Sequence, residues 1–259
     1  WQVNSYVVTA DAGAGLILQI EGWEIQDGNH TATKTVKFDS PYGTLPTPRK
    51  IGYLFDGWYF EETYQNVVIS TTIVKTADNH TIYAKWTPDP NTKFTVYHYV
   101  MDTQGAYPSL ADRTDNLTGT TDSTITLATF KQTSLEVAGG IVYKEGKVGD
   151  QVVTTTIILP DGSLVIKLYY ERLQHEATID ANKGYRVSDN KTEPVTNTYY
   201  YGETIEVPEY RRTGYTLTNY MLKGTESDAE ATGTFTFNTT PKTGTWTIGT
   251  QDETLSMVW

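Results

Sequence analysis

The sequence contains no cysteine among its 259 residues. Disulfide bonds, thiol nucleophiles and thiolate metal sites are therefore excluded, and the absence is compatible with an exported protein that avoids oxidation. Positive charge is also scarce, with 20 Lys and Arg against 31 Asp and Glu. A net charge of -11 without any basic stripe argues against nucleic acid and anionic membranes as partners, because both need clustered cations.

Long apolar runs are missing as well. The longest, such as Ile157-Ile158-Leu159, fall far below the roughly 20 residues needed to cross a bilayer. We therefore expect no membrane insertion within this segment. The sequence opens without a signal peptide, so we expect the sequences that target and anchor the protein to lie outside it.

The composition favours β-structure. Thr supplies 45 residues, and the 19 Tyr far outnumber the 7 Phe, which suits pleated strands better than helices. Helical signals are weak, because short helices fit only around 108–113 or 127–136 and no segment has a sustained apolar stripe. With 38% hydrophobic residues the chain can build packed cores despite its charge.

The sequence repeats itself. DNHTIYAKW at 78–86 resembles DETLSMVW at 252–259, and the aromatic marks Trp1, Trp86, Tyr170 and Trp259 are spaced 85, 84 and 89 residues apart. This spacing predicts three modules, at residues 2–88, 92–172 and 174–259. The first linker, around 87–90, contains two prolines, whereas the second, around 171–175, has neither Pro nor Gly and is predicted to be stiffer.

Further matched blocks relate the first and third modules but not the second. LPTPRKIGY at 45–53 matches VPEYRRTGY at 207–215, and TADAGAG at 9–15 matches TIDANKG at 178–184. In the middle module, TKFTVYHYV at 92–100 alternates with a period of two and predicts a strand. VVTTTIIL and LVIKLYY, separated by the turn residues 160–163, predict a β-hairpin.

These motifs resemble a known repeat. The run YGTLPTPRKIGYLFDGWY with NHTIYAKW is similar to the internalin-type B-repeat, or Listeria-Bacteroides repeat, of Gram-positive surface proteins. The third module resembles it less closely, because Leu217-Thr218-Asn219-Tyr220 replaces Phe-x-Gly-Trp. The middle module, with TVYHYV and PDGSLVIKLYYER, resembles a mucin-binding-protein (MucBP) repeat.

The resemblance implies a mainly β chain of small α+β, β-grasp-like modules in an extended array. It also implies an extracellular location, at the cell surface or cell wall, and a role in adhesion or in spacing an adhesin. It implies no catalysis and no cofactor. Host or environmental glycans or glycoproteins are the expected partners, and we expect the chain to be a monomer.

Aromatic side chains are the candidate ligand-binding residues, because flat rings stack on sugars. The best candidates are Trp58 and Tyr59 in the first module and Tyr199 and Tyr201 in the third. The alternative is that these rings pack in cores or across strands, since alternate residues of a strand face opposite sides.

The sequence contains no motif of a catalytic or metal-binding site. The four histidines, His30, His80, His98 and His175, are scattered without metal-ligand spacing, and no nucleophile-elbow sequence occurs. Asp112, Asp115 and Asp122 offer oxygen ligands for calcium, but no calcium loop is present and solvation is the alternative.

The sequence therefore predicts a non-catalytic tandem-repeat region of a bacterial surface adhesin, acting as a stalk or spacer whose repeated weak contacts add up. The alternative is a dedicated carbohydrate- or protein-binding module with a defined site. Exposed, planar aromatic pairs would favour this alternative, and their burial would favour the stalk.

Overall fold

The computed structural model describes residues 2–18, 20–226, 229–240 and 242–259, so the aromatic mark Trp1 lies outside the described residues. Their regular structure is β-strands and three short 3₁₀ helices, η1 (Asp27–Asn29), η2 (Leu127–Phe130) and η3 (Thr133–Leu135). The prediction of a mainly β chain is confirmed. The segment 108–113 forms no helix, and 127–136 forms only the turns η2 and η3. In the described part of the chain, no helix has both the length and the apolar character to cross a membrane.

The chain divides into two compact units. Unit 1 comprises Trp1–Thr95, Asn116–Ile125 and Thr156–Leu164, and unit 2 comprises Val96–Asp115, Thr126–Thr155 and Val165–Trp259. The predicted boundaries of three modules remain a prediction, because both units draw residues from the segment 92–172.

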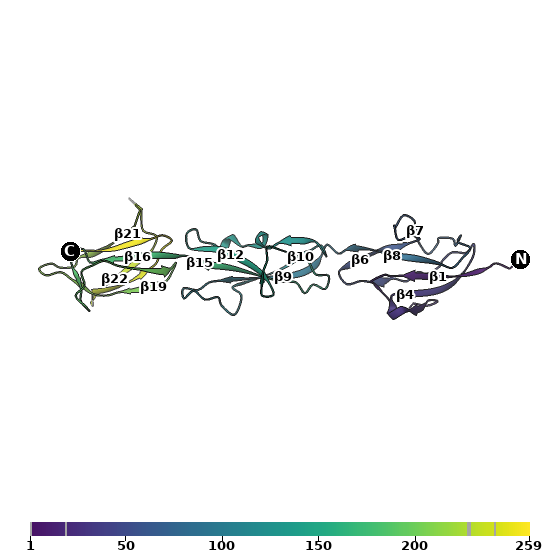
Figure 1. The fold of residues 1–259 in the computed structure, drawn as a ribbon, viewed down its shortest axis with the longest axis horizontal. Coiled ribbons are helices and arrows are strands. Elements are labelled where there is room, and N and C mark those ends of the chain that lie inside the picture. The colour runs from purple at the N-terminus through teal and green to yellow at the C-terminus, as the bar shows by residue number, and fades with distance from the viewer. Residues whose placement is uncertain (1, 19, 227–228, 241) are drawn as a thin grey trace. The chain divides into compact units, whose positions relative to one another are not determined.

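Unit 1 is built on a six-stranded sheet. Its strand order is β3 (Glu24–Gln26), β4 (Thr31–Lys37), β1 (Ser5–Asp11), β8 (His80–Pro88), β6 (Tyr53–Tyr59) and β7 (Val67–Val68). The neighbours β1 and β8 run parallel, and the other pairs are antiparallel. A separate small ribbon pairs β2 (Leu16–Ile17) with β5 (Pro48–Arg49). Figure 1 shows β1, β4, β6 and β8 side by side, in purple and blue.

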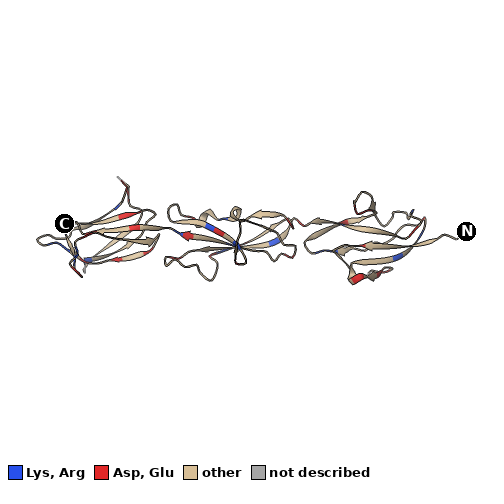
Figure 2. Cartoon of the chain, viewed as in Figure 1, with Lys and Arg blue, Asp and Glu red and all other residues tan. Residues whose placement is uncertain are grey.

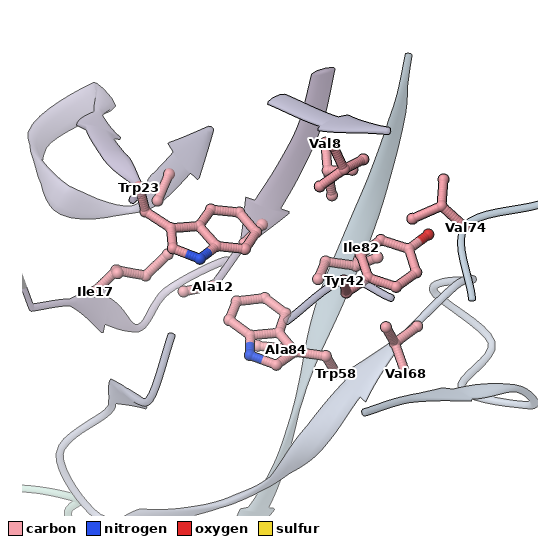
Figure 3. Close-up of a cluster of buried hydrophobic side chains, with 13 residues drawn as sticks. Val8, Ala12, Ile17, Trp23, Tyr42, Trp58, Val68, Val74, Ile82 and Ala84 are labelled. Atoms are coloured by element: carbon pink, nitrogen blue, oxygen red, sulfur yellow. The ribbon is translucent and has the colours of Figure 1, made fainter. Parts of the chain in front are cut away.

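The core of the N-terminal region, residues 5–88, packs against one face of this sheet. Trp58, Ile82 and Val8 come from three of its strands, and Trp23 and Tyr42 come from connecting segments. Figure 3 shows these five side chains gathered in one cluster. Burying such large rings supplies most of the apolar area that a small region can remove from water.

A five-stranded sheet follows. Its order is β10 (Arg113–Gly119), β9 (Thr92–Val100), β15 (Val165–Arg172), β12 (Ile141–Val148) and β13 (Gln151–Val152). The predicted alternation in β9 is confirmed, because Phe94, Val96 and His98 are buried while Thr95 and Tyr97 are less so.

The predicted hairpin in this part of the chain is wrong. The turn itself is present, since Gly162 has φ +74° and its N–H donates to the Leu159 carbonyl at 3.1 Å. However, β14 (Thr155–Ile157) pairs with β11 (Thr124–Thr126), whereas β15 lies between β9 and β12. The turn was predicted correctly, but the first predicted strand, 152–159, is divided between β13 and β14 in two different sheets. Local strand propensity does not specify a strand's partner, which depends on distant segments.

The C-terminal region, residues 174–259, contains a four-stranded sheet with the order β18 (Val195–Tyr200), β16 (Gln174–Asp180), β24 (Glu253–Val258) and β21 (Asn219–Gly224). A three-stranded sheet of β19 (Thr204–Val207), β23 (Lys242–Thr247) and β22 (Thr234–Thr239) lies in the same region, as does the ribbon of β17 (Tyr185–Arg186) and β20 (Tyr210–Arg211). Trp246, Leu255 and Met257 are fully buried in its core.

The N- and C-terminal regions share one connection pattern. Strand β16 pairs antiparallel with β18 and parallel with β24, as β1 pairs with β4 and β8. The ribbons match too, because Leu16 faces Arg49 in one and Tyr185 faces Arg211 in the other. The repeat between these two regions, predicted from three short sequence blocks, is thus present in the strand pairing.

Candidate functional site

Trp58, expected either in the core or in a glycan platform, lies in the core. Its side chain is only 2% exposed, and its indole N–H donates to the Pro46 carbonyl at 2.8 Å. The ring packs edge-on against Phe55 and lies among the buried side chains of Figure 3. A ring without an exposed face cannot stack on a sugar, so Trp58 has the packing role.

Tyr59 lies next to Trp58 on β6 and is half-buried. Its ring contacts Tyr64 edge-on with 5.6 Å between centroids, and the Lys85 ammonium lies 5.3 Å from its centre. Lys85 also forms an ion pair with Asp56 at 2.8 Å. These contacts make a small polar and aromatic cluster on the surface of the sheet, without a second ring coplanar with Tyr59.

The two C-terminal candidates have structural contacts within unit 2. Tyr199 on β18 packs against the core of the C-terminal region. Tyr201 donates its backbone N–H to the Leu173 carbonyl and accepts from the Arg172 guanidinium, both at 2.8 Å. That guanidinium also lies 5.6 Å from the Tyr201 ring centre. Tyr199 therefore packs in the core, and Tyr201 packs against the segment 172–173. Neither residue forms an open platform.

One cluster of titratable side chains resembles catalytic chemistry at first sight. His98 is completely buried, and its ring nitrogens lie 3.0 Å from the Tyr170 hydroxyl and 3.1 Å from the Asp115 carboxylate. Asp115 also accepts from Gln132 and Arg113, and the Tyr170 hydroxyl accepts the Gln132 backbone N–H at 2.7 Å. Neither His98 nor Tyr170 is exposed, and such a hydrogen-bonded network stabilises the middle of the chain.

The electrostatics of this cluster fit a structural role. Burial lowers the pKa of His98 below its usual value, although Asp115 opposes the shift. Burial alone would raise the pKa of Asp115, but Arg113 and His98 together lower it. The pair therefore holds a neutral imidazole against a carboxylate at neutral pH, which is a hydrogen bond rather than a full ion pair.

The three aspartates considered for calcium take part in separate interactions. Asp112 accepts the Val100 backbone N–H at 2.7 Å, Asp115 belongs to the His98 cluster, and Asp122 accepts from the Tyr53 hydroxyl. Within the described residues, no group of three or more His, Asp or Glu side chains is placed to hold a metal ion.

A groove that sequence reasoning missed is the best candidate binding site. It lies in the C-terminal region beside the ribbon of β17 and β20 and has a volume of about 350 Å³. We call it the C-terminal groove; its principal lining residues are Tyr185, Arg211, Arg212, Tyr215, Lys242 and Trp259. The signal was the block VPEYRRTGY, which the sequence analysis used only to detect the repeat.

The C-terminal groove is rich in rings and in positive charge. The Arg212 guanidinium lies 3.8 Å from the centre of the Tyr215 ring, and Tyr215 is 57% exposed. Arg211 forms an ion pair with Glu209 at 2.9 Å, and the Lys242 ammonium lies 3.5 Å from the Leu217 carbonyl. Its lining therefore has three cations against one carboxylate, in a chain that has more Asp and Glu than Lys and Arg. Figure 2 shows the two kinds of charge along the chain.

One known family model matches part of the chain. Residues 24–85 match the Listeria-Bacteroides repeat domain. This repeat belongs to surface proteins, is typical of extracellular ones, and is generally non-enzymatic. The match covers the N-terminal region from β3 to β8. No curated protein matches the chain.

Proposed function

We propose that this chain is a non-catalytic tandem-repeat region of a Gram-positive cell-surface adhesin, attached to the cell wall through sequences beyond this segment. It acts as a stalk that holds binding parts away from the cell and adds weak contacts of its own to host glycans or glycoproteins. Its modules are residues 2–88, 92–172 and 174–259, the middle one of the MucBP type. The family match at residues 24–85 supports a surface location.

The observation that carries the stalk role is the link between β15 and β16. Strand β15 ends at Arg172 and β16 begins at Gln174, so a single residue, Leu173, joins the five-stranded sheet to the four-stranded one. The Leu173 N–H donates to the Gly140 carbonyl, and its carbonyl accepts from Tyr201, both at 2.8 Å. A link with both backbone groups bonded has little freedom to rotate.

Two side chains beside the link, those of Arg172 and His175, also hydrogen-bond to backbone carbonyls within unit 2. Arg172 donates to the Met101 carbonyl at 2.9 Å and to the Tyr201 carbonyl at 2.8 Å. The His175 ring nitrogen lies 2.6 Å from the Gly139 carbonyl. Charge-assisted bonds from one guanidinium to two carbonyls favour a single orientation of the joint. A stalk needs such stiffness, because a freely jointed chain of the same length would reach less far.

Pulsed electron spin resonance between two spin labels tests the proposal. The chain has no cysteine, so Val152→Cys on β13 and Met221→Cys on β21 place two labels at exposed positions across the joint. We expect a distance distribution as narrow as that of a control pair within one sheet, Thr198→Cys with Met221→Cys. A broad distribution across an intact joint would contradict the stalk.

Two matched variants show which contacts produce the stiffness. Arg172→Ala removes both bonds to the carbonyls, so we expect the distribution across the joint to broaden. Lys144→Ala, which removes only an exposed pair with Glu171 at 3.0 Å, should leave the width unchanged. An unchanged width in Arg172→Ala would show that the backbone bonds of Leu173 hold the joint without the guanidinium.

The C-terminal groove favours a second candidate function, a binding module with a defined site. Its rings and cations suit an anionic ligand better than a neutral sugar. A glycan array that includes neutral mucin-type and acidic oligosaccharides distinguishes the two functions. Saturable binding by the intact chain, lost in a folded Arg212→Ala variant, would establish a binding module. If no glycan on the array is bound, the stalk remains the proposed function of the segment.

A further inference from the structure

The N-terminal region has its own version of the C-terminal groove. This N-terminal groove, of about 400 Å³, is lined by Ala14, Leu16, Arg49, Lys50, Ile51, Tyr53 and Pro160. The two correspond position by position, since the ribbons pair Leu16 with Arg49 and Tyr185 with Arg211. In each, a cation lies over the ring of a Tyr three residues later: Lys50 at 3.6 Å from Tyr53, and Arg212 at 3.8 Å from Tyr215.

Two turns of unit 1 itself pack beside the N-terminal groove. The Tyr53 hydroxyl donates to the Asp122 carboxylate, which raises the pKa of Tyr53. Pro160 forms part of the wall, and a Cβ added to Gly52 would lie 2.6 Å from its Cα. Backbone bonds continue the contact, because Asp89 donates to the Gly52 carbonyl at 2.9 Å and accepts from Thr121 at 3.0 Å. A pair of turns, one with a carboxylate and one with a proline, thus packs against Gly52 and Tyr53 at the edge of this groove.

The matching positions of the C-terminal groove are open. Gly214, at φ +82°, corresponds to Gly52 at φ +75°, yet a Cβ added to Gly214 would meet nothing within 4 Å. Among the described residues, no carboxylate contacts Tyr215 as Asp122 contacts Tyr53. The open groove has three cationic side chains, since Lys242 joins Arg211 and Arg212 and Glu209 pairs with Arg211, whereas the N-terminal groove has two, Arg49 and Lys50.

We propose that the C-terminal groove binds a pair of turns of another polypeptide segment, one with a carboxylate and the other with a proline, as the turns at 120–123 and 159–163 pack against Tyr53 and Gly52 in unit 1. Tyr215 donates its hydroxyl to the carboxylate, Arg212 adds charge beside it, and the proline packs over Gly214. Arg211 is already paired with Glu209, so Arg212 and Lys242 supply the net positive charge. An acidic oligosaccharide would supply only the negative charge of such turns. The turn with the proline would also fill the open space above Gly214.

A chain extended by its own sequence tests this proposal. Residues 87–172 are joined after Trp259, because the same segment follows Trp86 in unit 1. Nitration of tyrosines, located by mass spectrometry, then measures the protection of Tyr215. We expect about a tenfold lower nitration rate than in the unextended chain, which needs an effective concentration about ten times the dissociation constant.

The control is the same extended chain with Asp122→Asn and Pro160→Gly in the appended segment only, and it should restore nitration of Tyr215. The extended chain has two copies of Tyr170, which is completely buried in the unextended chain, so absence of any nitrated Tyr170 shows that the appended copy has folded as well. Equal nitration of Tyr215 in the extended and unextended chains, with Tyr170 protected, would overturn the proposal.

A second measurement applies if the appended segment does not fold. The unextended chain is titrated with an equimolar mixture of two backbone-cyclised peptides, residues 118–125 with Asp122 and residues 157–165 with Pro160, and amide shifts are followed by NMR. We expect saturable shifts at Arg212, Gly214 and Tyr215 that disappear in Arg212→Ala. No shift at the groove overturns the proposal. Saturable shifts at the groove with oligogalacturonate, without shifts from the peptides, would also overturn the proposal and would indicate an acidic sugar as the ligand.

Discussion

The N- and C-terminal regions keep the same bonds at the same places although few of their side chains agree. The indole N–H of Trp86 donates to the Ala12 carbonyl at 3.0 Å, and that of Trp259 donates to Ala181 at 2.9 Å. Where Asn79 accepts the backbone N–H of Val7, Asp252 accepts that of Glu176, both at 2.8 Å. The bonds that close the ends of strands are retained, while the surfaces around them differ.

The cores show where the two regions diverge. Trp58 on β6 faces Ala84, whereas the equivalent Tyr220 on β21 faces Met257. The smaller ring at Tyr220 is accompanied by Phe235 and by the fully buried Trp246 from the three-stranded sheet. The comparison teaches that one strand order accepts two different cores, provided that each supplies enough ring volume to fill it.

The largest expected effect comes from removing the ring that centres the N-terminal core. Trp58→Ala should lower the free energy of unfolding by about 3 to 5 kcal/mol, because it leaves a cavity and removes the hydrogen-bond donor of the Pro46 carbonyl. Urea denaturation measures the loss, and amide hydrogen exchange shows whether β6 and β8 open while the C-terminal sheet stays protected. Tyr59→Ala is the control and should change stability little. Equal midpoints for the two variants would mean that Trp58 is not the centre of the core.

A second test concerns Gly15 and Gly184, which lie against the rings of Trp86 and Trp259. A Cβ on Gly15 would lie 2.3 Å from the Trp86 ring, and one on Gly184 would lie 2.3 Å from the Trp259 ring. Gly15→Ala and Gly184→Ala should therefore each cost about 1 to 3 kcal/mol, since the ring must move away from its carbonyl partner. Thermal unfolding of both variants compares the regions directly. If the losses differ widely, the two tryptophans do not play the same part.

A double mutant separates the clash from other effects of the methyl group. Trp86→Phe shortens the ring that the new Cβ meets, so Gly15→Ala should cost less in that background than in the native one. An unchanged cost would place the strain in the backbone rather than against the ring.

The sequence predicted what depends on short spacing. Period-two alternation located β9, and the recurring blocks located the equivalent strands β8 and β24, because each signal lies within a few residues. Burial of Trp58 was one of two stated alternatives, and only the packing of distant segments such as Tyr42 and Val74 decides between them.

The pairing of β14 with β11 and the C-terminal groove were missed for one shared reason. Both depend on segments far apart in the chain: 124–126 with 155–157 for the strands, and 185, 212 and 242 for the groove. A local pattern gives the residue type at each place but not which places meet. The Arg-Arg pair within VPEYRRTGY was visible in the sequence, yet it identifies a groove only once Tyr185 and Lys242 lie beside it.

The smallest expected effect concerns the hydroxyl that distinguishes Tyr220 from Trp58. Among the described residues, the buried Tyr220 hydroxyl has no hydrogen-bond partner, and burial raises its pKa to about 12. Tyr220→Phe should therefore stabilise the chain by about 1 kcal/mol, because it removes a desolvated polar group without opening a cavity. Tyr42→Phe is the matched control and should destabilise by a similar amount, since that hydroxyl lies 2.6 Å from the His80 ring nitrogen. Chemical denaturation gives both signs. A loss of stability in Tyr220→Phe would show that this hydroxyl is bonded in solution.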